Sequence, residues 1–314
     1  MCCNSDFVLD LKYSFCNNFE LFIIMDVKAG GDLNFLIGQM KSQGGFTKEM
    51  TQYYIARTCE GLRDIHGAGW IYRDLKPENL LLGDDGTCMI SDLGLACPWK
   101  EGMHDIAGTP GYWPPEMLRK EAYDKGVDYW TLGVVLVEFL TGTCPFRNKA
   151  ALEFGKAKGE KDKLLCCNMA VMEMEVEYDS EKMDENAIDL AKKLLAKDPK
   201  ERLGKNGVSD IRSHKFFDGF DWDAVADGSM VPPYVPEADV NAADQDSIGK
   251  FKNEIEIKEI NLSDKDHAKY KKFADTNKRA FEIDVAGLLI WEKSKGRPLT
   301  ATPEMERSKT CSLM

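Results

Sequence analysis

Apolar residues recur at helical spacing in the first half of the chain. After Thr47, a candidate helix N-cap, Ile55, Cys59, Leu62 and Ile65 follow one another at spacings of four and three. Such spacing places side chains on one face of an α-helix. The pattern therefore predicts an amphipathic helix that ends at the glycine-containing segment behind it.

Three further segments carry helical signals. Asp32 can cap a helix that follows it, because a short side-chain acceptor satisfies a free N–H group of the first turn. Residues 128–140 are almost wholly apolar, so this helix is expected at the centre of the fold. Apolar positions within residues 188–195 predict another helix, closed by Pro199.

Strand signals are short and lie in two regions. Residues 7–11 and 21–25 are rich in β-branched and aromatic residues and flank a turn signal at residues 16–18, so they predict two strands. Residues 70–116 are dense in Gly, Pro and Asp and predict short strands and loops. The Pro-Pro-Tyr-Val-Pro segment at residues 232–236 is expected to be extended.

The C-terminal part of the chain changes character. Residues 264–292 regain helical periodicity, and residues 293–314 are polar and carry five basic against two acidic residues. The second composition is typical of a disordered tail.

Composition and charge narrow the function. The 314 residues are 43% hydrophobic and 30% charged, as in an ordinary globular protein of one large domain or two average ones. The net charge of −12 argues against nucleic acid as a partner, since phosphate binding needs clustered Lys and Arg. No apolar run is long enough to span a bilayer, and no signal peptide is recognised. We therefore expect a cytoplasmic protein.

The ten cysteines are expected to be reduced thiols. In a chain of this length without a secretion signal, a disulfide framework is the less favoured interpretation. Cys2-Cys3 and Cys166-Cys167 are adjacent pairs without the spacing of zinc ligands.

Candidate chemistry is concentrated in residues 72–79, Tyr-Arg-Asp-Leu-Lys-Pro-Glu-Asn, and in the Ser-Asp-Leu-Gly of residues 91–94. Phosphoryl transfer from a nucleotide needs one carboxylate to orient a hydroxyl, a second carboxylate and an amide oxygen to hold Mg²⁺, and a cation beside the transferred group. Turn-forming roles for the two aspartates are the alternative.

These segments resemble the protein-kinase catalytic loop, H-R-D-x-x-x-x-N, and the metal-binding triplet D-F-G, in the variants Y-R-D and D-L-G. The Pro-Pro-Glu of residues 114–116 stands where the family has A-P-E. Asp128 fits the start of the family's central helix, and Arg202 fits its late arginine. The resemblance implies an α+β protein-kinase-like fold that uses ATP and Mg²⁺.

Several segments narrow the resemblance to AGC-type kinases and, within them, to G-protein-coupled receptor kinases. They are Tyr72 in place of His, residues 90–97, 108–112 and 232–236, and residues 240–244 and 270–274, which are similar to that family's C-terminal tail. The implied activity is that of a serine/threonine protein kinase, with an activated G-protein-coupled receptor as substrate.

The resemblance also assigns roles to individual residues. Asp74 would orient the substrate hydroxyl, and Lys76 would stabilise the transferred phosphoryl group. Asn79 and Asp92 would hold Mg²⁺.

ATP contacts are implied in the same way for residues around the hinge. Met25 would be the gatekeeper, and backbone groups of Asp26 and Lys28 would bind adenine. Asp32 would reach the ribose, and Leu81 would pack beneath the base.

The activation segment has an acidic residue where many relatives carry a phosphothreonine. Asp105 lies four residues before Thr109, and its carboxylate could pair with Arg73 without phosphorylation. A solvated loop aspartate is the alternative. Thr109 would help position the peptide, and Glu116 would pair with Arg202.

Parts of a complete kinase are not found in the sequence. It has no G-x-G-x-x-G loop over the phosphates and no V-A-I-K-like segment with a strand lysine. The simplest interpretation is an N-terminally truncated chain, and a non-catalytic kinase-like binding protein or inactive fragment is the alternative.

The last four residues, Cys311-Ser312-Leu313-Met314, match a C-a-a-X prenylation signal, and the terminal Met favours farnesyl. Together with the resemblance to the prenylated rhodopsin-kinase-like branch, this predicts peripheral membrane association through Cys311. The basic residues of the tail would add attraction to anionic lipid.

The expected organisation is a mainly α-helical large lobe with a remnant of the β small lobe and an AGC-type C-terminal tail. The expected parts are 1–26, two strands of the small lobe; 27–217, the large lobe; 218–263, the AGC-type tail; 264–292, a helical segment resembling the end of the receptor-kinase helical domain; and 293–314, a flexible tail.

Overall fold

The computed structural model describes residues 5–16, 21–204, 206–237 and 273–294, and the chain divides into two units. The first, here called the helical unit, includes the described residues up to 10 and those from 27 to 237. The second, here called the hairpin unit, includes residues 11–16, 21–26 and 273–294.

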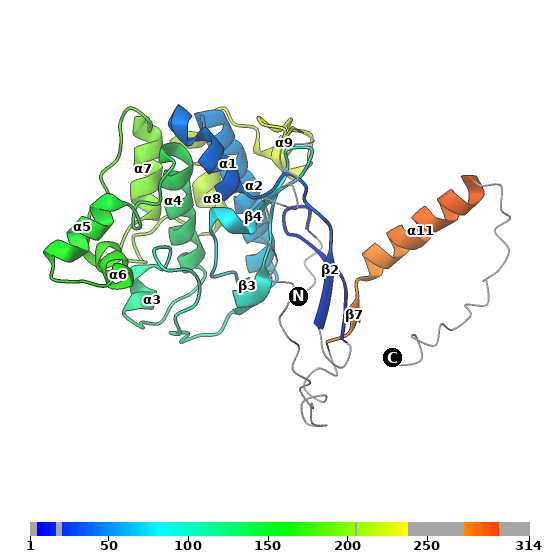
Figure 1. The fold of residues 1–314 in the computed structure, drawn as a ribbon, viewed down its shortest axis with the longest axis horizontal. Helices are drawn as coiled ribbons and strands as arrows, with labels where there is room; N and C mark the ends of the chain where they lie inside the picture. The colour runs from blue at the N-terminus through cyan, green and yellow to red at the C-terminus, as the bar shows by residue number, and fades with distance from the viewer. Residues whose placement is uncertain (1–4, 17–20, 205, 238–272, 295–314) are drawn as a thin grey trace, which may run out of the picture. The chain divides into compact units, whose positions relative to one another are not determined.

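Helices are the main secondary structure of the helical unit, as predicted (Figure 1). The α-helices are α1 Leu33–Met40, α2 Lys48–Gly67, α3 Pro115–Leu118, α4 Gly126–Thr141, α5 Lys149–Ala157, α6 Lys163–Glu173, α7 Glu185–Leu194, α8 Val208–Arg212 and α9 Trp222–Ala226. Short 3₁₀ turns are η1 Lys41–Gln43, η2 Pro77–Asn79, η3 Leu93–Leu95 and η4 Lys215–Phe217.

The predicted helix caps are confirmed. The Asp32 carboxylate accepts the N–H of Phe35 at 2.8 Å before α1. The Thr47 hydroxyl accepts the N–H of Met50 at 3.2 Å before α2. The helix predicted to end at Pro199 ends earlier than expected: α7 spans Glu185–Leu194.

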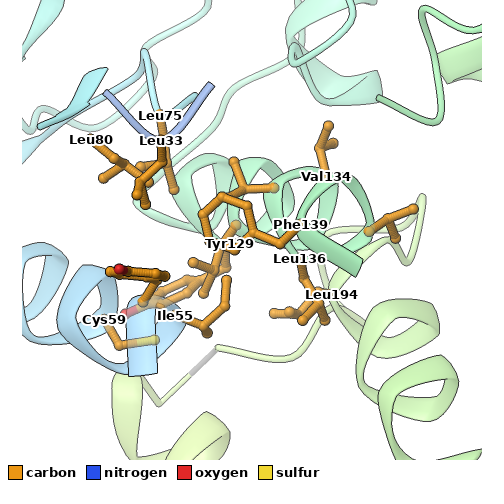
Figure 2. Packing of buried hydrophobic residues seen from close by; sticks show 14 of the residues in the cluster. Leu33, Ile55, Cys59, Leu75, Leu80, Tyr129, Val134, Leu136, Phe139 and Leu194 are labelled. Atoms are coloured by element: carbon orange, nitrogen blue, oxygen red, sulfur yellow. The ribbon is translucent and has the colours of Figure 1, made fainter. Parts of the chain in front are cut away.

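The centre of the helical unit is α4, as its apolar sequence predicts. Its residues from 127 to 140 are all buried, and it contacts both α2 and α7. Figure 2 shows Ile55 of α2, Tyr129 of α4 and Leu194 of α7 in one buried cluster. Burying such side chains stabilises the fold by about 1.5–3 kcal/mol each, so this cluster holds the three helices together.

Two small antiparallel pairs of strands lie in this unit. β3 Trp70–Ile71 pairs with β6 Cys97–Pro98, and β4 Leu80–Leu82 pairs with β5 Cys88–Ile90. The loops of the candidate site run between these strands, so the pairing brings residues 72–79 and 91–96 close to each other.

The prediction of a strand at residues 7–11 is wrong. Phe7, Val8 and Leu9 are buried in the helical unit, where Val8 forms a single parallel bridge to Ile90. The Arg57 side chain donates to the carbonyl of Asp6 at 3.0 Å and covers the Phe7 ring. The apolar run is therefore anchored by core burial on α2 and β5 instead of by pairing with residues 21–25.

The hairpin unit begins at Leu11. β1 Leu11–Cys16 pairs with β2 Leu21–Met25, as the sequence predicts for the second strand, and with β7 Asp275–Thr276 on its other side. Of the helical segment predicted at residues 264–292, the structure shows α11 Lys278–Ser294, and residues 264–272 lie outside the described residues. Residues 275 and 276, in contrast, form a strand, because they pair with β1 instead of extending the helix.

The segment at residues 232–236 forms neither helix nor strand, and it packs on the turn between β4 and β5. Gly86 in that turn has φ +85°, and a Cβ there would lie 2.9 Å from the Pro232 side chain. Only glycine therefore fits this position. The motifs at 240–244 and 270–272, the tail 295–314 and Cys311 lie outside the described residues.

Candidate active site

The loop of residues 72–79 is held by a buried carboxylate on α4. Asp128 accepts the backbone N–H groups of Tyr72 at 3.0 Å and Arg73 at 2.8 Å, and it bonds His66 Nε2 at 2.7 Å. Arg73 has φ +72°, a conformation that costs energy for a side chain larger than glycine. The two hydrogen bonds to Asp128 stabilise this backbone, and they set where the next residue, Asp74, projects.

Asp74 is the centre of a compact polar cluster. Its Oδ1 accepts the Thr109 hydroxyl at 2.6 Å, and its Oδ2 accepts Lys76 Nζ at 2.8 Å and Asn79 Nδ2 at 3.0 Å. Lys76 Nζ also donates to Thr109 Oγ1 at 2.9 Å. The structure thus brings together four of the residues that the sequence singles out, on a loop, a 3₁₀ turn and the activation segment.

Asp92 lies on the neighbouring loop. The residue before it, Ser91, donates its N–H to the carbonyl of Asn79 at 2.8 Å, and its carbonyl accepts the Tyr72 hydroxyl at 2.6 Å. Asp92 itself has φ +51°, and its carboxylate accepts the N–H of Gly94 at 3.1 Å. These bonds fix the start of the Asp92 loop against the loop that carries Asp74.

The electrostatics of Tyr72 agree with this arrangement. Burial raises the pKa of the Tyr72 hydroxyl well above its usual value, and the nearby charges of Asp74, Asp92 and Asp128 raise it further. Tyr72 therefore stays a neutral donor to Ser91 at any physiological pH.

The donor set suits a divalent cation carried by a phosphate ligand. A carboxylate from Asp92 and an amide oxygen from Asn79 are hard oxygen ligands, and Mg²⁺ in such sites takes one or two protein oxygens and completes its shell with phosphate and water. Within the described residues, no group of three or more His, Cys, Asp or Glu side chains could hold a metal alone.

Two of the expected nucleotide contacts are brought together in the helical unit. Asp32 and Leu81 form an antiparallel bridge, supported by hydrogen bonds of 2.8 Å from the Gly30 N–H to the Leu82 carbonyl and from the Leu82 N–H to the Gly31 carbonyl.

The other residues expected to contact the nucleotide are Met25, Asp26 and Lys28. Lys28 is half-buried in the helical unit. Met25 and Asp26 belong to the hairpin unit, where Asp26 pairs with Lys12 at 2.6 Å. Adenine binding by Met25, Asp26 and Lys28 stays a prediction.

The activation segment is tied to the loop through Arg73. Arg73 Nη1 lies 2.6 Å from Asp105 Oδ2, so the pairing that the sequence suggested is present. Burial alone would raise the pKa of Asp105, but hydrogen bonds from Arg73 and Tyr123 and the Arg73 charge lower it overall. Tyr123 donates to Asp105 at 3.0 Å and accepts from Arg73 at 3.0 Å. It belongs to none of the sequence motifs, so sequence analysis did not identify it.

A buried ion pair closes the activation segment. Arg202 donates through Nη1 and Nη2 to the two carboxylate oxygens of Glu116 at 2.5 and 2.8 Å, and both side chains are almost fully buried. The guanidinium also lies over the Trp130 ring of α4. The pairing predicted for these two residues, 86 positions apart, is therefore seen as a bidentate contact.

Sequence reasoning missed a second buried carboxylate. Glu138 on α4 accepts the Tyr112 hydroxyl at 2.6 Å. Burial raises the pKa of Glu138 to about 7, the Tyr112 hydrogen bond opposes this, and the charge of Glu78 adds to it. Inside an apolar helix, Glu138 could have been noticed as a misplaced charge, but nothing in the sequence indicates its partner.

This pKa predicts a pH-dependent stability. Because the folded-state pKa lies above the ordinary value of 4.5, the contribution of Glu138 is complete below pH ~4.5 and is lost as the pH rises to about 7. We expect the loss to be roughly 3 kcal/mol. Urea unfolding between pH 4.5 and 8 should show that Glu138→Gln removes this component. A difference between wild type and variant that does not change with pH would contradict the assignment.

Comparisons with known proteins show which sequences the chain is similar to. Residues 1–217 match the protein kinase domain family. The chain is 35% identical to rat rhodopsin kinase GRK1 over 87% of its own length and 48% of the relative's. It is 36% identical to G protein-coupled receptor kinase 2 of Caenorhabditis elegans, over 85% of this chain and 36% of that protein.

A third relative has a similar coverage. Rhodopsin kinase grk7-b of Xenopus laevis is 35% identical over 86% of this chain and 48% of its own length. The chain thus spans about half, or less, of the length of these relatives. In the described part of the chain, no helix combines the length and apolar character needed to cross a membrane.

Proposed function

The chain belongs to the protein kinase family, of the G-protein-coupled receptor kinase type, and from this premise we propose that it phosphorylates serine and threonine residues of an activated receptor. The reaction transfers the γ-phosphoryl group of ATP to a protein hydroxyl. The observation that carries the proposal is the cluster around Asp74.

The cluster contains the groups that phosphoryl transfer needs. Asp74 would orient the acceptor hydroxyl and accept its proton, and the two hydrogen bonds to its Oδ2 hold the carboxylate in one orientation. Lys76, 2.8 Å from Asp74, would stabilise the charge of the transferred group. Thr109 bonds both residues, so it would keep the activation segment aligned with the loop that carries them.

Asn79 and Asp92 would hold Mg²⁺, and Asp32 and Leu81 would contact the ribose and the base. When bound, the metal neutralises charge on the phosphate oxygens. For Met25, Asp26 and Lys28, contact with adenine stays a prediction from the resemblance to kinases.

Mg·ATP binding by this chain tests the proposal. We expect Mg·ATP to stabilise the chain against unfolding by about 2.7 kcal/mol when the free nucleotide is roughly a hundred times its Kd. The increase should be weaker without Mg²⁺ and in Asp92→Asn. Asp84→Asn removes an exposed carboxylate outside the cluster and serves as the matched control.

The competing function is a kinase-like protein that binds a receptor without using ATP. The given sequence contains no G-x-G-x-x-G loop and no V-A-I-K-like segment. No stabilisation at millimolar Mg·ATP would support this alternative and count against the proposed transfer activity.

Membrane attachment is proposed separately. Cys311 within Cys-Ser-Leu-Met would carry a farnesyl group, and the chain would then associate peripherally with the cytoplasmic face of a membrane. One prenyl chain binds a bilayer only marginally, so the basic residues of the tail would add to the affinity. Farnesyl addition in a cell extract, read as intact mass with Cys311→Ser as control, tests this.

A further inference from the structure

The helices α5 and α6 form an antiparallel pair at one edge of the helical unit (Figure 1). They pack closely at Gly155, where a Cβ would lie 2.5 Å from Cys166 Cβ. Lys158, just after α5, pairs with Glu173 at the end of α6 at 2.8 Å. The turn between the helices is therefore held in a defined position. Residues 156–165, which end α5, form this turn and begin α6, are here called the α5–α6 tip.

Lysines are concentrated at the α5–α6 tip, although the whole chain is acidic. Residues 156–163 hold four lysines against two acidic residues, whereas the net charge of the chain is −12. Lys156, Lys161 and Lys163 are exposed, and within the part of the chain that the structure describes none of them forms an ion pair. These three ammonium groups can therefore meet an anionic surface without first breaking a salt bridge.

Two leucines are exposed beside these lysines. Leu164 and Leu165 lie in the first turn of α6, with 41% and 47% of their surfaces exposed. The Asp162 carboxylate accepts their backbone N–H groups at 2.8 and 3.1 Å. This cap fixes the turn that presents the leucines, and it places the Asp162 charge at the positive end of the helix. The tip thus presents aliphatic side chains among cations.

This combination fits the surface of an anionic membrane. Leucine side chains can enter the boundary between headgroups and acyl chains, while lysines keep their ammonium groups among the lipid phosphates. Interfaces between proteins are, in contrast, depleted in lysine and enriched in aromatic residues and arginine. Residues 156–165 contain no aromatic residue and no arginine. An acidic protein is therefore the less suitable occupant.

We propose that the α5–α6 tip docks on an anionic lipid surface, with its two leucines inserted and its three unpaired lysines in contact with lipid phosphates. The inference deepens the proposed membrane attachment, and it rests on that attachment for the surface that the chain meets. One prenyl chain binds a bilayer only marginally. A second contact, made by folded residues, would make the attachment stable and would set which side of the helical unit faces the lipid.

Flotation with lipid vesicles tests the inference on the full chain, made without a farnesyl group so that Cys311 carries no lipid. The vesicles contain phosphatidylcholine alone or with about 30% phosphatidylserine. At about 0.15 M salt, we expect binding only to the vesicles that contain phosphatidylserine, because the lysines need an anionic surface. Raising the salt to about 0.5 M should weaken this binding.

Two charge variants show whether the tip makes the contact. The first replaces the three unpaired tip lysines: Lys156→Gln, Lys161→Gln and Lys163→Gln. It should weaken binding about 100-fold, since each lysine near an anionic surface contributes about fivefold. The matched control replaces three exposed lysines outside the tip: Lys120→Gln, Lys200→Gln and Lys215→Gln. It lowers the net charge equally and should weaken binding by less than about threefold, because salt screens distant charges.

A third variant separates insertion from charge attraction. Leu164→Ser with Leu165→Ser keeps every charge and removes the apolar area that would enter the bilayer. We expect about tenfold weaker binding to the vesicles with phosphatidylserine. Urea unfolding of each variant verifies that the fold is kept, as expected for side chains that are exposed.

Four results would overturn the inference. They are equal weakening by the tip lysine variant and its control, unchanged binding in the leucine variant, no binding of the wild-type chain at millimolar lipid, and binding of a Glu-rich peptide in place of vesicles, which would assign the tip to an acidic protein. Failure of the proposed function is seen separately. Flotation needs neither nucleotide nor farnesyl group, so a chain that fails to bind Mg·ATP or to accept farnesyl still tests the tip.

Discussion

Asp74→Asn should lower the rate of phosphate transfer from Mg·ATP to a protein serine by about 10²–10⁴-fold, the range for loss of a general acid–base group. Asparagine keeps the shape of the side chain but cannot accept the hydroxyl proton. Its amide oxygen can still accept from Lys76 and Asn79, and its NH₂ group can donate to the Thr109 hydroxyl, which is free to rotate. The packing of the cluster is therefore preserved.

The measurement is the initial rate of transfer at saturating Mg·ATP, with urea unfolding in parallel. We expect the free energy of unfolding to change by less than about 1 kcal/mol, so that lost activity reports chemistry and not folding. Asp84→Asn is the matched control and should keep full activity. Transfer that survives in Asp74→Asn would refute the role of Asp74, and a wild-type chain without transfer would favour the non-catalytic alternative.

The largest effect on stability is expected at the Glu116–Arg202 pair. Arg202→Met should lower the free energy of unfolding by about 3–5 kcal/mol, because it leaves the Glu116 carboxylate buried without a partner. The hydrogen bond from Arg202 to the carbonyl of Gly126, 3.1 Å long, is lost as well. Since Glu116 ends the activation segment, the same change should weaken the position of Thr109.

A double-mutant cycle separates the pair from its surroundings. Glu116→Gln alone should also destabilise the fold, since it leaves the Arg202 charge buried. The double variant should lose less free energy of unfolding than the two single variants lose together, because no unpaired charge remains. Urea denaturation of the four proteins measures this coupling, and additive losses below about 1 kcal/mol each would show that the pair contributes little.

Local sequence was sufficient where the signal and its structural consequence lie within a few residues. The caps at Asp32 and Thr47 act on the next turn of their own helices. The apolar sequence of residues 128–140 implied burial wherever that helix packed. The strand at residues 7–11 was mispredicted because an apolar run has the same appearance whether it pairs in a hairpin or is buried against α2 and β5.

The motif residues of the candidate site could be identified because phosphoryl transfer needs a fixed set of groups at fixed spacing. The resemblance to kinases even indicated the pairing of Glu116 with Arg202. Tyr123 and Glu138 were not found, since each acts through a partner distant along the chain: Asp105 and Tyr112, respectively.

The amino-acid sequence by itself determined the helical architecture, the family and the residues that carry the proposed chemistry, since periodicity, caps and motif spacing are properties of neighbouring residues. Only the tertiary structure decided that Asp105 pairs with Arg73, that Glu138 is buried with a raised pKa, and that the Arg147 stem lies against Gly111. Burial and electrostatic environment depend on which distant segments meet, and that is set by packing of the whole core.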